Sequence, residues 1–189
     1  MSGFRPQLSS SSLYELVDNV IIYLSSNNLI DKFKLQKAVF YFLWRYSQYK
    51  NIDFGLIAQK FDMVPYKYGP YSESVDGEID TLVSRGFLDR KSESEFKATP
   101  KGVSELGKLD ADVKFLVDDI LNLLSKVDSK TLVFFIYYNP YIPNDVKSYF
   151  TSKSEIKEHF KSNKEKYIKV LKDAGIIEKD TAELILSYE

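Results

Sequence analysis

Apolar residues recur every three or four positions in several stretches of the chain, a spacing that predicts amphipathic helices. The first stretch follows a serine-rich start and places on one face Leu13, Leu16, Val17, Val20, Ile21 and Leu24. A second helix is predicted after Asp31, whose carboxylate can cap it. Its inward face is predicted to carry Leu35, Val39, Phe42, Leu43 and Tyr46. The opposite face then carries Lys34, Lys37 and Arg45.

A third helix is predicted within residues 61–90. Gly69 and Pro70 mark a turn, and Ser72 can cap the helix that follows it. The apolar face of this helix is formed by Val75, Ile79, Leu82 and Val83. Gly86 is expected to end it. Residues 51–60 fit a short helix and a short strand equally well.

The segment 87–98 has two short apolar ends around a polar run, which predicts a β-hairpin. Thr99 can cap a further helix with Pro100 at its first position, running through Leu106 to Gly107. Three helices, a hairpin and a helix, in this order, are typical of a winged helix. We therefore expect a winged helix-turn-helix domain with a small β-hairpin wing over residues 1–109.

Residues 110–189 predict a C-terminal helical region that can share one core with the first region. A helix starting near Asp110 has an apolar face that can pack within the chain or form a homodimer, and that comprises Val113, Leu116, Val117, Ile120, Leu121 and Leu124. Ser129 can cap a mostly apolar helix that Pro140 and Pro143 end. From Ser152 to Gly175 a further helix is expected, and a last short one after Thr181. The apolar side of the helix after Ser152 comprises Ile156, Phe160, Tyr167, Val170 and Leu171. The predicted fold class is mainly α.

The amino-acid composition excludes several classes of function. With 44% hydrophobic residues the chain can bury a sizeable core, and its net charge of −1 gives no global attraction for nucleic acid. The absence of cysteine excludes disulfides and cysteine-based zinc fingers. The start of the chain lacks the features of a signal peptide, and the longest apolar run, residues 132–138, is too short to span a bilayer. We expect a cytoplasmic protein without a membrane partner.

Candidate catalytic chemistry is limited to His159, which lies in a lysine-rich stretch without an evident partner. A single titratable group rarely forms an active site. The acidic residues show no metal-ligand spacing, and no glycine-rich phosphate loop is present. The sequence therefore predicts no enzyme activity, catalytic residue, metal or cofactor.

Charge on the third helix argues against insertion into a DNA groove. Carboxylates occupy its first turns, while Arg85 and Arg90 lie at or beyond its end. These carboxylates are Glu73, Asp76, Glu78 and Asp80. Residues 153–172 carry seven lysines and three glutamates, a net +4, which we interpret as a solvated helix face in preference to a phosphate-binding one. If nucleic acid is bound, the candidate contacts are Lys157, Lys161, Lys164, Arg85, Arg90 and Lys91.

Three tyrosines surround the predicted turn: Tyr66, Tyr68 and Tyr71. Alternate tyrosines in a turn are difficult to bury together, and tyrosine is frequent in protein interfaces. We expect one or two of these side chains to be exposed. With Glu73 and Asp76 they predict a contact surface for a protein partner.

Two segments carry a family resemblance. KLQKAVFYFLW at positions 34–44 and YKYGPYSESVDGEIDTLVSRGFL at positions 66–88 resemble the Panacea (SocA-like antitoxin) and YwgA-like proteins. The resemblance implies a mainly helical fold whose members act as antitoxins or as adaptors that hold a partner protein. The motif positions are Lys34, Leu35, Gln36, Lys37, Tyr68, Gly69 and Pro70, of which the polar ones, including Lys34 and Lys37, can orient the turn or contact a partner. Residues 84–106 are similar to the wing region of PadR and MarR regulators.

These observations favour a non-enzymatic winged-helix module that binds a protein partner, a toxin or another client. The alternative is a sequence-specific DNA-binding transcriptional regulator.

Overall fold

The computed structural model describes residues 10–106, 109, 111–150 and 154–187, and in this part the chain is mainly helical with two small antiparallel sheets. The helices of the first half are α1 (Ser10–Leu24), α2 (Lys32–Lys50), α3 (Phe54–Lys60), α4 (Glu73–Ser84) and α5 (Pro100–Ser104). The strands are β1 (Ile30–Asp31), β2 (Met63–Tyr66), β3 (Gly69–Ser72), β4 (Leu88–Arg90) and β5 (Glu95–Ala98). The helices of the second half are α6 (Ala111–Lys126), α7 (Ser129–Tyr138), α8 (Asn144–Lys147), α9 (Ser154–Ser162), α10 (Lys164–Asp173) and α11 (Lys179–Ser187).

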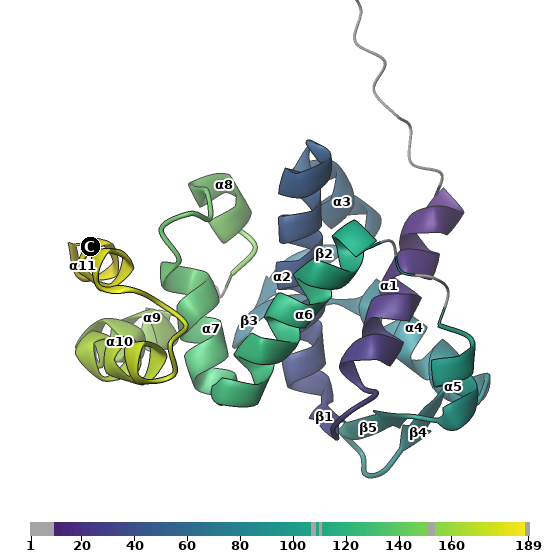
Figure 1. The fold of residues 1–189 in the computed structure, drawn as a ribbon. Coiled ribbons are helices and arrows are strands. Elements are labelled where there is room, and N and C mark those ends of the chain that lie inside the picture. Colours follow the sequence, from purple (N-terminus) through teal and green to yellow (C-terminus); the bar gives the residue numbers. More distant parts are fainter. Residues whose placement is uncertain (1–9, 107–108, 110, 151–153, 188–189) are drawn as a thin grey trace, which may run out of the picture.

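Helix α2 is the central element of the fold (Figure 1). Twelve of its nineteen residues are buried, because α1, α3, α6 and α7 all pack around it. Its amino end is capped by Asp31, whose carboxylate accepts a hydrogen bond from the Lys34 backbone N–H at 2.8 Å. Its carboxyl end is closed by Asn51 in the left-handed region, with φ of 52°. The predicted cap and inward face of this helix are confirmed.

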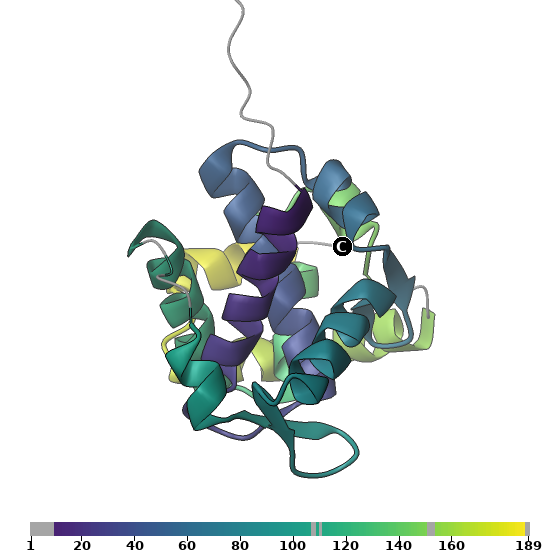
Figure 2. The same ribbon diagram turned by 90° about the vertical axis from the view of Figure 1, so that its right-hand side faces the viewer.

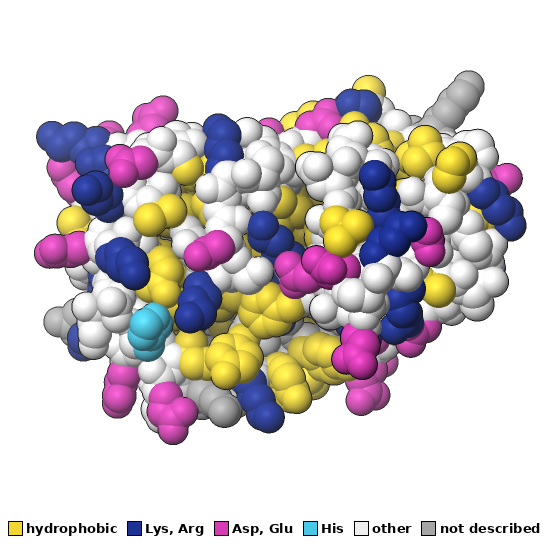
Figure 3. Space-filling view, turned by 90° about the horizontal axis from the view of Figure 1, so that it is seen from below, with side chains coloured by type: hydrophobic (Ala, Val, Ile, Leu, Met, Phe, Trp, Pro, Cys, Tyr) yellow, Lys and Arg dark blue, Asp and Glu magenta, His cyan; other side chains and the backbone are white. Residues whose placement is uncertain are grey.

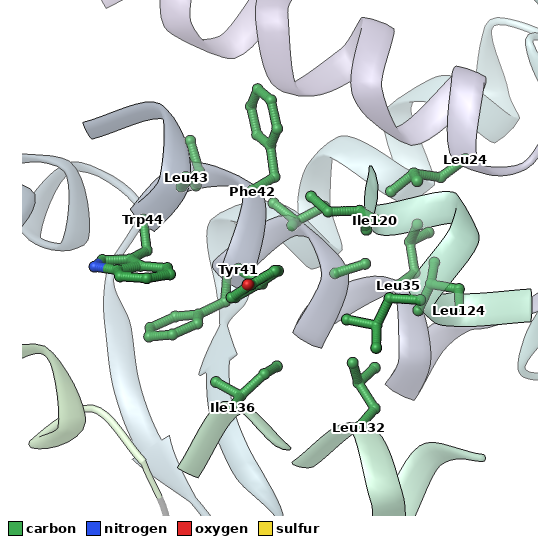
Figure 4. Packing of buried hydrophobic residues seen from close by; sticks show 14 of the residues in the cluster. Leu24, Leu35, Tyr41, Phe42, Leu43, Trp44, Ile120, Leu124, Leu132 and Ile136 are labelled. Atoms are coloured by element: carbon green, nitrogen blue, oxygen red, sulfur yellow. The ribbon is translucent and has the colours of Figure 1, made fainter. Parts of the chain in front are cut away.

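One hydrophobic cluster joins the two halves of the chain. Figure 4 shows part of it, where Leu35 of α2 lies near Leu124 of α6 and Leu132 of α7. The apolar face of α6 is buried in this cluster against α1 and α2, so it does not offer a free surface for a homodimer. The apolar face of α6, which suggested a homodimer, packs within the chain instead.

The first sheet has the strand order β1-β5-β4. Phe96 of the central strand β5 lies between Ile30 of β1 and Arg90 of β4. Figure 2 shows its β4–β5 hairpin at the lower end of the molecule. The predicted hairpin within 87–98 is present, whereas the two-residue strand β1 was not predicted. Thr99 caps α5 as expected, but the helix ends at Ser104, and Gly107 lies outside the described residues.

The second sheet is a hairpin that the sequence interpretation missed. Gly69 and Pro70 do not form the turn: they begin β3, and the turn lies at Lys67 and Tyr68. Strands β2 and β3 pair antiparallel with Pro65 opposite Pro70. Neither proline has an N–H group, so this pair must occupy a position without ladder hydrogen bonds. A register shift of one residue would place a proline where a donor is needed, which fixes the pairing.

Several predicted boundaries are corrected. The ambiguous segment 51–60 contains helix α3, with Asp53 as its cap. The cap of α7 is Asp128, which accepts from the Thr131 N–H at 2.7 Å, and Ser129 is already the first helical residue. The helix expected from Ser152 to Gly175 is two helices, interrupted at Asn163, and Val170 is exposed. Helix α8 was not predicted, and Asp110 and Ser152 lie outside the described residues.

Candidate functional site

The β2–β3 hairpin is attached to α2 by two buried polar side chains, and the first is Gln36. Its amide Nε2 donates to the Ser72 carbonyl oxygen at 2.9 Å, and its Oε1 accepts from the Ser72 N–H at 3.2 Å. The side chain thus pairs with both the N–H and the carbonyl oxygen of one residue of β3, Ser72, as a neighbouring strand would. Gln36 is only 4% exposed, so these bonds have no competition from water.

The second buried group is Lys37. Its Nζ donates to the Pro70 carbonyl oxygen at 2.6 Å and lies 4.6 Å from the centre of the Phe33 ring. The residue is 2% exposed, and this burial lowers the pKa of Lys37 to about 8, with Asp76 acting in the opposite direction. The expectation that Lys37 faces away from the core is therefore wrong.

The close contact between the Lys37 side chain and β3 requires a glycine at position 69. Its φ of +105° is a conformation that residues with a side chain rarely adopt. A Cβ at this position would lie 3.1 Å from Cε of Lys37, closer than ordinary van der Waals contact. The glycine of the Tyr-Gly-Pro motif therefore lets β3 approach the buried lysine.

Ser72 connects the hairpin to α4. Its Oγ accepts from the Val75 N–H at 3.0 Å, which is the predicted helix cap, and donates to the Phe61 carbonyl oxygen. Gly86, with φ of +73°, follows the end of α4 as predicted. One serine at the end of β3 therefore caps α4 and connects its start to the end of α3.

Asp76 closes this network from the first turn of α4. Its carboxylate accepts from Gln36 Nε2 at 2.5 Å and from the Tyr71 hydroxyl at 2.7 Å, and it lies 2.9 Å from Lys32 Nζ. The hydrogen bond to Asp76 is the first cause that raises the pKa of Tyr71 to about 12, with burial and the charge of Glu73 adding to it. Asp76, expected to bind a partner, is engaged by its own chain.

The outer face of the hairpin is exposed. Tyr66 is 48% exposed and Tyr68 54% exposed, and Val64 is exposed beside them, while Tyr71 is half-buried with its ring centre 5.2 Å from that of Tyr66. We call Val64, Tyr66 and Tyr68 the hairpin surface. The prediction that one or two of the three tyrosines are exposed is confirmed. Seen from below, the molecule has a group of uncovered hydrophobic side chains with lysines and carboxylates around them (Figure 3).

Of the other predicted partner contacts, Glu73 and Lys34 have different environments. Glu73 is exposed at the start of α4, next to the hairpin. The Nζ of Lys34 donates to the Leu124 carbonyl oxygen at 3.0 Å, so this half-buried lysine joins α2 to the end of α6. Glu73 is available to a partner, whereas Lys34 serves the fold.

The predicted nucleic-acid residues form two separate groups. Arg85 lies 3.8 Å from Asp18, Arg90 lies 2.5 Å from Asp80, and Lys91 pairs with Asp89, so carboxylates accompany each cation near the β4–β5 hairpin. The other group lies on α9 and α10, at the opposite end of the molecule (Figure 1). The structure does not bring the two groups together into one basic surface.

On α9 and α10 the predicted lysines also differ. Lys157 and Lys161 are exposed. Lys164 Nζ lies 4.9 Å from the centre of the Tyr138 ring, and burial, followed by the charge of Lys161, lowers the pKa of Lys164. His159 is exposed, and its Nε2 is 3.0 Å from the Tyr167 hydroxyl.

One polar site was not recognised in the sequence. Asp18 of α1 borders a cavity of about 430 Å³ between α1, the end of α4 and α5. Burial and then a hydrogen bond to Glu78 raise the pKa of Asp18 to about 7, against the charge of Arg85. Its spacing from Val17 and Ile21 placed it at the edge of the apolar face, which was the only available signal.

Within the described residues, no group of three or more histidine, cysteine or acidic side chains could hold a metal ion. No helix in the described part of the chain is long and apolar enough to cross a membrane. No protein-family model matches the chain, and neither a curated protein nor a solved structure matches it.

Proposed function

We propose that this protein is a non-enzymatic, winged-helix-like module that binds another protein, as an antitoxin or an adaptor does, through the hairpin surface. The observation that carries the proposal is the pairing of exposed tyrosines with a buried polar attachment. Tyr66 and Tyr68 face solvent, while Gln36 and Lys37 hold the same hairpin against α2.

The buried attachment supports a binding role because it reduces the entropy that an interface must lose. Binding orders side chains and loops, and surfaces that are already held in place avoid part of this cost. Tyrosine provides a large contact area with few rotatable bonds and is enriched among residues that dominate binding energy. The exposed rings on a fixed hairpin meet both conditions.

The winged-helix part of the proposal is supported by the element order. Helices α1, α2 and α4 are followed by the β4–β5 hairpin, and β1 pairs with β5 to complete a three-stranded sheet. The α3–β2–β3 segment is then an insertion between the second and third helices of the motif. This insertion carries the hairpin surface.

Element order also favours the alternative, a sequence-specific DNA-binding regulator, since winged helices commonly bind DNA. The charges oppose it: the first turn of α4 carries Glu73 and Asp76, and Arg85 and Arg90 lie near carboxylates. A regulator would lose affinity for duplex DNA steeply as salt rises. Tight, salt-sensitive duplex binding would favour it over our proposal.

A photo-crosslinking amino acid tests the proposal directly. It is introduced at Tyr68 and, as a matched control, at Tyr141, which is 66% exposed and lies after α7. We expect a discrete protein adduct in cells of the source organism at position 68 and none of the same mass at position 141. Identical adducts at both positions, or no adduct at position 68, would contradict a specific hairpin surface.

A further inference from the structure

We infer that the segment of the partner that contacts the hairpin surface is basic and carries arginine or lysine. This inference rests on the proposed function and adds the chemistry of the partner to it. It is carried by the charge around the hairpin, the accessible faces of its rings and the sequence of its free edge.

The segment that forms the hairpin and α4 is acidic in a nearly neutral chain. Residues 61–84 contain five carboxylates and one lysine, a net charge of −4, whereas the whole chain carries −1. Asp76 is neutralised by Lys32, and Asp80 by Arg90. Glu73 and Asp62 remain exposed where the hairpin meets α4, and Asp62 accepts a hydrogen bond from the Ser74 hydroxyl at 2.8 Å.

Glu73 directly follows the last residue of β3 and stands two positions after Tyr71. Its charge contributes to the raised pKa of Tyr71, and Tyr71 packs against Tyr66. A guanidinium group can pair with a carboxylate and stack on a neighbouring aromatic ring at the same time. An arginine of the partner can therefore use Glu73 and Tyr66 together.

The chain places one of its own lysines over a ring of the hairpin surface and another over the Phe33 ring beside it. Lys37 Nζ lies 4.6 Å from the centre of the Phe33 ring, and Phe33 packs edge-on against Tyr68. Lys67 Nζ lies 5.9 Å from the centre of the Tyr66 ring. A cation over the face of an aromatic ring is attracted by the negative face of the ring. The rings thus offer faces at which a cation is stabilised.

The free edge of β2 argues against the other common way to bind a peptide at a hairpin. Pro65 sits at a position without ladder hydrogen bonds to β3, so its backbone faces the outer edge, where it has no N–H to donate. Addition of a strand along β2 would lose a hydrogen bond there. We therefore infer that the partner is recognised through side chains, namely the carboxylates and the aromatic rings of this region.

Defined peptides test the inference. A short peptide of alternating arginine and glycine, and the same peptide with glutamate in place of arginine, are titrated into the protein by calorimetry and amide NMR at low salt. We expect the arginine peptide alone to bind, with shifts centred on residues 63–73. Tyr66→Ala combined with Tyr68→Ala should weaken binding about tenfold and Glu73→Gln about threefold, while Tyr141→Ala should leave it unchanged within about twofold.

Each other outcome has a definite meaning. Equal binding of the glutamate peptide, or equal affinity in the tyrosine variants, would overturn the inference. If the crosslinker at Tyr68 captures a protein whose linked segment has no basic residue, protein binding stands and the basic partner is wrong. If neither peptide nor protein is captured, both proposals fail. Self-association at low salt that is lost on changing Lys157 and Lys161 to Glu would identify a second copy, seated by α9, as the occupant and would also overturn the inference.

Discussion

The molecule has two short antiparallel hairpins that are held in place in different ways. The β2–β3 hairpin is attached through buried polar side chains, Gln36 and Lys37, whose partners are backbone groups of β3. The β4–β5 hairpin is attached through backbone pairing with β1, and its side-chain ion pairs are exposed. Buried hydrogen bonds are costly to leave unmade, whereas exposed ion pairs contribute little. The first hairpin therefore has one position relative to α2 and can present a fixed surface.

The largest expected effect comes from Gly69→Val. The β-branched side chain is incompatible with φ of +105° and meets Lys37, so we expect a loss of about 3 kcal/mol in the free energy of unfolding. The control is Gly86→Val at the base of the other hairpin, where φ is also positive but a Cβ meets no atom within 4 Å. Urea denaturation measures both. Equal losses would mean that only backbone strain matters and that close packing on Lys37 does not.

Gln36→Leu should have the next largest effect. The leucine leaves the N–H and carbonyl of Ser72 without their side-chain partner in a buried position, so we expect a loss of about 2 kcal/mol. Gln59→Leu on the exposed side of α3 serves as the control and should change stability by less than about 0.5 kcal/mol. Faster amide hydrogen exchange in β3 with unchanged exchange in β5 would show that the loss is confined to the first hairpin. Uniform acceleration would instead indicate that Gln36 supports the whole core.

Lys37→Met tests the buried charge through the pH dependence of stability. The pKa of Lys37 is about 8 in the folded protein and 10.5 in the unfolded chain, so the unfolded state binds more protons between these values. The contribution of Lys37 to stability should therefore rise as the pH increases from 7 to 10. We expect the wild type to gain about 2 kcal/mol relative to Lys37→Met over this range. Asp18 is present in both proteins, so its titration cancels in the difference. A difference that does not change with pH would show that the lysine is hydrated.

The features that could be predicted from the sequence are those set by neighbouring residues. The caps at Asp31, Ser72 and Thr99 and the helix end near Gly86 each depend on side chains within a few positions, and all are confirmed. The exposure of one or two of the turn tyrosines was also predicted, because alternate tyrosines in a turn are difficult to bury together and tyrosine is frequent in interfaces. These local rules located the hairpin surface without showing how it is held.

What could not be predicted depends on partners that are distant in the sequence. Lys37 and the Pro70 carbonyl are 33 positions apart, and a lysine on a helix is normally taken as exposed. Strand β2 contains a proline and does not alternate in polarity, so no strand pattern was visible. Asp128 and Ser129 are adjacent capping residues between which sequence alone does not choose.

The smallest expected effect belongs to the other hairpin. Arg90→Ala removes an ion pair with Asp80, in which both side chains are largely exposed, and a contact with the Phe96 ring at 5.1 Å. We expect a loss of no more than about 0.5 to 1 kcal/mol, smaller in high salt, because exposed pairs are weak and screened. Urea denaturation at low and high salt measures it, with Asp80→Asn as the partner variant. A loss as large as that from Gln36→Leu would remove the distinction between the two hairpins, since an exposed ion pair would then hold its hairpin as firmly as a buried amide.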